Sequence, residues 1–128
     1  MIAVKSTYLK QEVVKAVLGE ATFPSISNVY LALYAGNVTV DDDTSKEVSG
    51  GSYGRQQLSF ANASGGSKTS DTAETFSSMP AVTVTHWGIR DASSGGNLLY
   101  FGAFDLPIEL NATDDLPIAS GDIVIGEV

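Results

Sequence analysis

Two apolar runs on either side of a glycine-rich turn decide the fold of this chain: residues 81–104 read AVTVTHWGIRDASSGGNLLYFGAF. In the first run, residues 81–89, side chains alternate with the two-residue period of a β-strand. The turn at residues 93–97 consists of serine, glycine and asparagine, and glycine and asparagine tolerate positive φ. The second run, residues 98–104, is again apolar. The sequence therefore predicts a β-hairpin with strands at 81–89 and 98–104.

A further strand is predicted at residues 29–35, where both alternating faces are apolar. Tyr30 and Tyr34 lie on one face, whereas valine and leucine occupy the other. A strand of this kind is covered on both sides. We expect one face to contact the core and the other to contact the helix or a neighbouring subunit.

The remaining β segments are shorter. Residues 53–60 predict a strand with one solvent-exposed face, and apolar runs around Pro107 and Pro117 predict further short strands. Proline lacks an N–H, so each of these two prolines limits pairing in a central strand. Residues 37–51 carry three consecutive aspartates followed by serine and glycine, which is typical of a solvated loop.

One segment, Tyr8 to Leu18, has the periodicity of an amphipathic helix. Ser6 or Thr7 can supply the N-cap oxygen, and Gly19 stands where a left-handed residue ends a helix.

Together these segments predict a mainly β fold, an antiparallel β-sandwich or jelly-roll-like domain with one short N-terminal α-helix. Compact domains commonly hold about 100 to 150 residues, so we expect residues 1–128 to form a single domain. Hydrophobic residues make up 43% of the chain and charged residues 17%, which is enough apolar surface to build a core. The sequence has no internal repeat or heptad, so it does not predict a fibre shaft built by this chain alone.

Composition excludes several classes of partner. The chain has 15 acidic and 7 basic residues, a net charge of −8, which repels a nucleic-acid backbone. No run approaches the roughly 18 apolar residues of a membrane helix, and the N-terminus lacks a secretory signal's apolar core. We therefore expect no nucleic-acid and no membrane partner. The absence of cysteine excludes disulfides, thiolate zinc sites and a cysteine nucleophile.

Gly50–Gly54 matches G-x-S-x-G, the pattern of a serine nucleophile elbow. The residues after Ser52 read as a strand instead of a helix, and the chain is too short for an α/β-hydrolase sheet. The single histidine, His86, lies beside Trp87 in a predicted strand, which is typical of a structural histidine. The sequence therefore predicts no catalytic residue and no enzyme activity.

Metal and phosphate sites are weakly indicated. Asp41–Asp43 and Asp114–Asp115 offer oxygen ligands for calcium, but Lys46 stands where an EF-hand loop needs glycine, and the final glutamate is missing. Residues 65–69, GGSKT, are similar to part of a phosphate loop but lack its first glycine and its helix. We predict no metal-binding residue and no cofactor.

Aromatic and arginine side chains on the predicted strands are suited to contacts with other subunits, because interface cores are enriched in them. The interface candidates are Tyr30, Tyr34, Tyr53, Arg55, Trp87, Tyr100 and Phe101. Exposed aromatic rings among them would alternatively form a platform for a host glycan.

Residues 47–56, EVSGGSYGRQ, and residues 86–103, HWGIRDASSGGNLLYFGA, resemble small virion structural proteins of tailed bacteriophages. These proteins are often labelled tail-fibre proteins. The resemblance spans most of the chain and is weakest after Asp105. It implies a non-enzymatic virion component that assembles in the host bacterial cytoplasm with other virion proteins.

Within the particle, we favour a capsid decoration (cement) protein that bridges subunits of the major capsid protein, because a short acidic β domain without repeats suits a capsid surface. Stable interfaces bury about 1,200 Å² or more, and we expect a homo-oligomer, either a dimer or a trimer. A tail-fibre or baseplate-associated structural protein is one alternative. A host-glycan binding module is the other.

Overall fold

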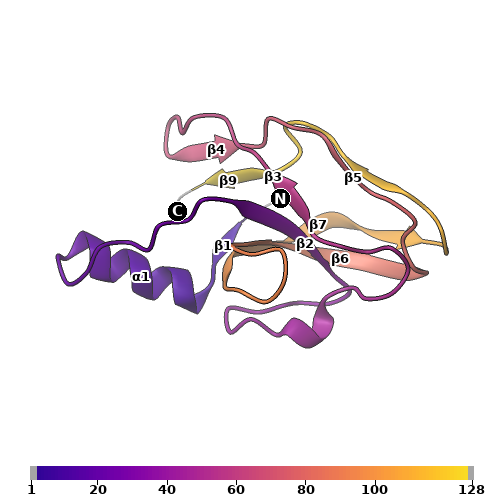
Figure 1. Ribbon diagram of the computed structural model, residues 1–128, viewed down its shortest axis with the longest axis horizontal. Helices are drawn as coiled ribbons and strands as arrows, with labels where there is room; N and C mark the ends of the chain where they lie inside the picture. The colour runs from indigo at the N-terminus through magenta and orange to yellow at the C-terminus, as the bar shows by residue number, and fades with distance from the viewer. Residues whose placement is uncertain (1–2, 127–128) are drawn as a thin grey trace.

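The computed structural model describes residues 3–126 (Figure 1). Along the chain, the elements are β1 (Val4–Lys5), α1 (Thr7–Val17), β2 (Val29–Tyr34), the 3₁₀ turn η1 (Thr44–Lys46), β3 (Gln56–Leu58), β4 (Ser67–Thr69), β5 (Glu74–Phe76), β6 (Val82–Arg90), β7 (Leu98–Leu110), β8 (Leu116–Ile118) and β9 (Val124–Gly126).

A five-stranded antiparallel sheet in the order β1-β7-β6-β2-β3 forms the base of the fold. The predicted hairpin lies at its centre, where β6 and β7 pair antiparallel from Arg90 opposite Leu98 to Val82 opposite Leu110. This confirms the hairpin and its turn. The second strand is longer than predicted because it continues to Leu110.

Two short antiparallel ribbons, β4–β9 and β5–β8, form a second layer on one face of the sheet (Figure 1). Apolar side chains from both layers make the main core, including Leu31, Leu33, Trp87 and Ile89 from the sheet. A mainly β antiparallel fold with one short N-terminal helix is thus confirmed. The second layer consists of two separate ribbons, so it is not one of the paired four-stranded sheets that a jelly roll would have.

The opposite face of β2 is also buried, as predicted from its two apolar faces. Ala32 and Tyr34 pack there with Val38, Leu98 and Phe101 in a second apolar cluster. The cover comes from this chain's own 37–51 loop and hairpin, where we expected the helix or a neighbouring subunit.

The 37–51 loop is therefore more ordered than its composition predicts. Val38 and Val48 are buried, at 0% and 4% exposure. Val38 alternates only with Val40, and Val48 stands alone among polar residues, so neither predicts a strand; the prediction of a solvated loop was wrong for this part.

A large irregularity in the central hairpin explains two further differences from the sequence prediction. Val84 pairs with Ile108 and His86 with Ala103, so one residue of β6 faces four residues of β7. The bulge places Val84 in the same core as Trp87, although strict alternation assigns them to opposite faces. It also contains Pro107, which therefore does not interrupt a regular ladder.

Helix α1 begins and ends at the predicted signals. The Ser6 side chain accepts a hydrogen bond from the Leu9 N–H, and Gly19 follows the helix with φ of 78°. Ser6 Oγ also donates to the Leu98 carbonyl, which fixes the start of the helix to β7. Leu9 is the buried residue of α1. No helix within residues 3–126 is long and apolar enough to cross a membrane.

Candidate functional site

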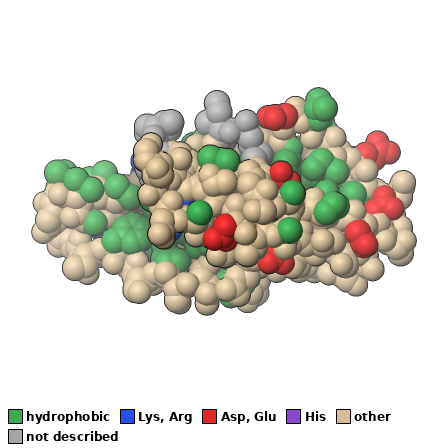
Figure 2. Space-filling model, turned by 90° about the horizontal axis from the view of Figure 1, so that it is seen from above, with side chains coloured by type: hydrophobic (Ala, Val, Ile, Leu, Met, Phe, Trp, Pro, Cys, Tyr) green, Lys and Arg blue, Asp and Glu red, His purple; other side chains and the backbone are tan. Residues whose placement is uncertain are grey.

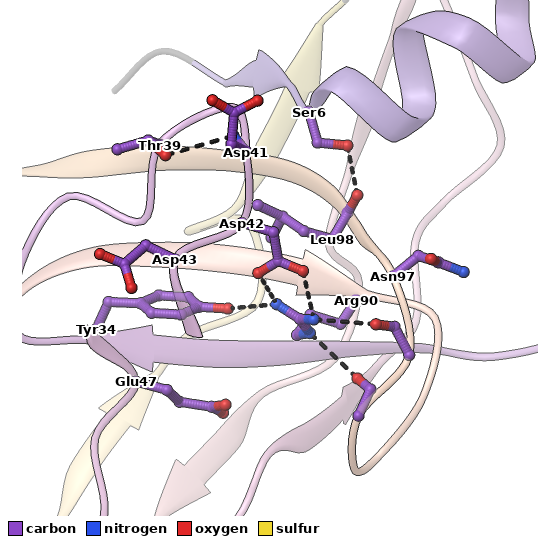
Figure 3. A network of polar contacts seen from close by, with 12 residues as sticks. Ser6, Tyr34, Thr39, Asp41, Asp42, Asp43, Glu47, Arg90, Asn97 and Leu98 are labelled. Atoms are coloured by element: carbon purple, nitrogen blue, oxygen red, sulfur yellow. Dashed lines mark hydrogen bonds and ion pairs between the residues drawn. The ribbon is translucent and has the colours of Figure 1, made fainter. Parts of the chain in front are cut away.

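A buried arginine lies at the centre of a network of polar contacts (Figure 3). Arg90 ends β6, beside the hairpin turn, and its side chain is 1% exposed. The 37–51 loop approaches it with Asp42, and β2 approaches with Tyr34. Segments that lie far apart in the sequence therefore meet at one guanidinium group.

The five N–H groups of Arg90 all donate hydrogen bonds within the chain. Nη1 donates to the Tyr34 hydroxyl at 3.1 Å and to Asp42 Oδ1 at 2.7 Å. Nη2 donates to Asp42 Oδ2 at 2.8 Å and to the Gly96 carbonyl at 3.1 Å. Nε donates to the Gly95 carbonyl at 3.3 Å. Because a guanidinium carries five N–H donors, the binding capacity of Arg90 is used up inside the chain.

The environment of Arg90 keeps it charged. Burial lowers the pKa of the Arg90 guanidinium, but hydrogen bonds to Asp42 and Tyr34 outweigh burial, and the net shift is upward. Burial also raises the pKa of the Tyr34 hydroxyl. The site therefore holds a bidentate ion pair and a neutral phenol, and the two parallel hydrogen bonds of the pair fix the position of Asp42 relative to Arg90.

A second arginine contacts the same hairpin turn from the other side. Arg55 makes a bidentate pair with Glu47, with both N···O distances at 2.8 Å. Its Nη1 donates to the carbonyls of Ala92 at 3.0 Å and Gly95 at 2.9 Å. The Gly95 carbonyl therefore accepts from Arg55 and Arg90 alike.

Tyr53 completes this second pair. Its hydroxyl donates to Glu47 Oε2 at 2.7 Å and accepts from the Leu33 N–H at 3.1 Å. Its ring stacks on Phe76, with centroids 5.9 Å apart. The ring therefore connects the sheet to the β5–β8 ribbon.

The two arginine networks hold the hairpin turn and the 37–51 loop in one conformation. Every contact given above for Arg90 and Arg55 is made to another residue of this chain. These contacts join the hairpin turn to the 37–51 loop and to β2.

Acid should weaken the Glu47 pair. Burial raises the pKa of the Glu47 carboxyl, but hydrogen bonds from Arg55 and Tyr53 outweigh it and lower the pKa below the ordinary 4.5. A carboxylate with a lowered folded-state pKa contributes stability above pH 4.5 and loses it as the pH falls through the folded value. We expect the urea midpoint to fall below that pH, and to fall less steeply in Glu47→Gln. Equal slopes in both proteins would contradict this.

The G-x-S-x-G string forms a packing turn. The Ser52 N–H donates to the Ser78 carbonyl at 2.9 Å, and Gly51 has φ of 53°. A Cβ on Gly51 would lie 2.7 Å from the Ser78 carbonyl oxygen and 2.9 Å from the Pro80 nitrogen. The glycine is thus required by close backbone approach.

We expect Gly51→Ala to lower the free energy of unfolding by about 1–3 kcal/mol, because the added methyl group meets backbone that cannot move aside. Gly65→Ala is the matched control, since Gly65 has a similar φ of 60° but a Cβ there meets nothing within 4 Å. Chemical denaturation of both variants tests this, and equal losses would contradict the packing argument.

The other candidate chemical groups also have structural contacts. His86 Nδ1 lies 2.8 Å from Thr85 Oγ1, and burial lowers the pKa of its imidazole. Asp43 accepts from Ser45, while Asp42 pairs with Arg90. No group of three or more His, Cys, Asp or Glu side chains among residues 3–126 could hold a metal ion.

The predicted interface residues fall into two groups. Tyr34, Trp87 and Phe101 are buried in the apolar clusters. Tyr30, Tyr53, Arg55 and Tyr100 are partly buried. Because the first three have almost no exposed surface in this chain, a glycan platform cannot include Tyr34 or Trp87. A role of the partly buried four in subunit contacts stays a prediction.

Sequence reasoning missed Arg90, Asp42 and Glu47 as a set. One signal was present, since Arg90 follows an apolar strand directly and needs a counter-charge if buried. Its partner lies 48 residues away in the chain, among three consecutive aspartates, and the sequence does not indicate which of the three pairs with Arg90.

Comparison with known proteins gives one family. A protein-family model described as "Podophage GP4 fiber I protein gp80" matches residues 4–126. No curated protein matches the chain.

Proposed function

The chain belongs to the podophage GP4 fiber I protein gp80 family, and from this premise we propose that it is a structural component of a podophage tail fibre. Membership makes it a small phage fibre-type structural protein, which is a part of the virion and associates with other virion proteins. The observation that carries the proposal is the family match over residues 4–126.

The structure supports an adaptor-like role within the fibre. Its elements are short strands around two apolar clusters, without a repeat that extends along one axis. The arginine networks hold the loops at one end of the sheet in a fixed shape. We propose that all 128 residues act as one domain, because both apolar clusters take side chains from β2 and β7.

Imaging of labelled particles tests this proposal. A fibre component is expected at the tail, in the few copies that a tail carries, and quantitative gel analysis of purified virions gives that number. A capsid decoration protein, the reading we favoured from the sequence, would instead cover the shell in large copy number. Label distributed over the shell would overturn the fibre proposal in favour of capsid decoration.

A further inference from the structure

An exposed apolar patch lies at the free end of α1, and we call it the arm patch. It consists of Val14, Val17 and Leu18. Val17 is 74% exposed and Leu18 78%. Val14, Val17 and Leu18 are spaced three and four residues apart, so they form one stripe, and Lys10 continues it toward the body. Figure 2 shows hydrophobic side chains gathered at this end of the molecule.

An apolar groove lies between residues 104–108 of β7 and the strand β8, which pairs with β5; β5 lies toward the end of the molecule away from α1 (Figure 1). This distal groove has a volume of about 360 Å³. Its apolar lining is Phe104, Leu106, Ile108, Leu116, Pro117, Ile118 and Ile123. Leu106 is 77% exposed, so the groove is edged by a large apolar side chain in contact with solvent. The bulge that carries Leu106 out of the ladder creates this edge.

The segments that carry the two surfaces differ in net charge, although Glu20 lies beside Val14 of the arm patch. Residues 3–23, which include α1, have three lysines and two glutamates, a net charge of +1. Residues 69–126 have eight acidic residues and one basic residue, Arg90, which pairs with Asp42. Asp122 lines the distal groove, and Glu109 follows Ile108 on β7. Acidic side chains are visible at this end in Figure 2.

We propose that the arm patch of one copy of this chain docks into the distal groove of a second copy. Apolar surface meets apolar surface, and Lys10 meets the acidic surroundings of the groove. A contact between two different surfaces is heterologous, so it repeats from copy to copy and produces a ring or an open chain. This deepens the proposed fibre role and rests on it.

The test uses sedimentation of the purified chain and two variants. Val17→Asp disrupts the arm patch, and Leu106→Asp disrupts the distal groove; both side chains are exposed, so folding should be retained. We expect the unaltered chain to form oligomers and each variant to be monomeric. An equal mixture of the two variants should form a one-to-one dimer, because the first retains its groove and the second its arm. Ser94→Asp, which changes the charge equally on an exposed turn, should leave assembly unchanged.

A monomeric unaltered chain would overturn this inference, and so would oligomers that persist in Leu106→Asp. Circular dichroism of each variant separates lost contact from lost fold. Labelling of virions is independent of these results, so the fibre proposal can stand if self-association fails. Conversely, label on the capsid shell would remove the fibre role while leaving the measured contact intact.

Discussion

Arg90→Met is expected to lower the free energy of unfolding by several kcal/mol, because each buried polar group left without its partner, such as the Tyr34 hydroxyl, costs about 1–3 kcal/mol, whereas Asp42 is 27% exposed and can be hydrated. Asp42 would lose both hydrogen bonds of its carboxylate to the guanidinium, and the Gly96 carbonyl would lose a donor. Methionine fills similar space, so the loss reports on charge and hydrogen bonding. Urea unfolding, followed by fluorescence of the single tryptophan, measures it.

Two companion variants identify the mechanism of that loss. Arg90→Lys keeps the charge but cannot reproduce the planar set of five donors. Its free energy of unfolding should therefore lie between that of the unaltered chain and that of Arg90→Met. Asp42→Asn removes the charge of the partner and serves as the second single variant in a double-mutant cycle with Arg90→Met. The double variant should lose less than the sum of the single losses, because both remove the same pair. Additive losses, or a loss below about 1 kcal/mol for Arg90→Met, would contradict the central role of the pair.

The parts of the fold that sequence predicts well are those whose signals are local. Ser6 and Gly19 mark the ends of α1 because capping depends on residues within one turn. The 93–97 turn marks the hairpin for the same reason, since Gly95 and Gly96 both adopt positive φ. Each of these features was readable from fewer than ten neighbouring residues.

The features that sequence did not predict depend on contacts between distant segments. The bulge opposite Thr85 depends on how two strands pair over a long range, and Pro107 marks an interruption in β7 without indicating its size. The loop valine Val38 is buried because Tyr34 and Phe101 leave an apolar surface for it to cover. Asp42 was one of three adjacent aspartates, and only the fold selects it as the partner of Arg90.

The interface candidates illustrate a related difficulty. A strand with two apolar faces predicts that both faces are buried, but it does not indicate whether the residues that cover them belong to the same chain or to another subunit. For Tyr34, the structure supplies that cover internally. Among residues 3–126, the three most exposed large apolar residues, Val17, Leu18 and Leu106, lie at a helix end and in a bulge, where the spacing of apolar residues does not predict exposure.

Trp87→Ala should be the other severe change, with an expected loss of about 3–5 kcal/mol, as is usual when a large aromatic side chain is removed from a core. Trp87 is 0% exposed and stands in the central hairpin pair, opposite Leu33 on β2 and Gly102 on β7. Circular dichroism during urea unfolding measures the loss, since the fluorophore is gone.

Comparison of Trp87→Phe with Trp87→Ala tests whether the loss of stability comes from lost packing or from a lost hydrogen bond of the indole. Within residues 3–126, Trp87 Nε1 is buried and no hydrogen-bond acceptor reaches it. Phenylalanine keeps most of the apolar volume and removes this unsatisfied donor, whose burial costs about 1–3 kcal/mol. We therefore expect Trp87→Phe to lower the free energy of unfolding by less than about 1.5 kcal/mol, because removal of the unsatisfied N–H offsets part of the cost of the cavity. A loss as large as that of Trp87→Ala would contradict this expectation, because removal of Nε1 would then bring no compensating gain.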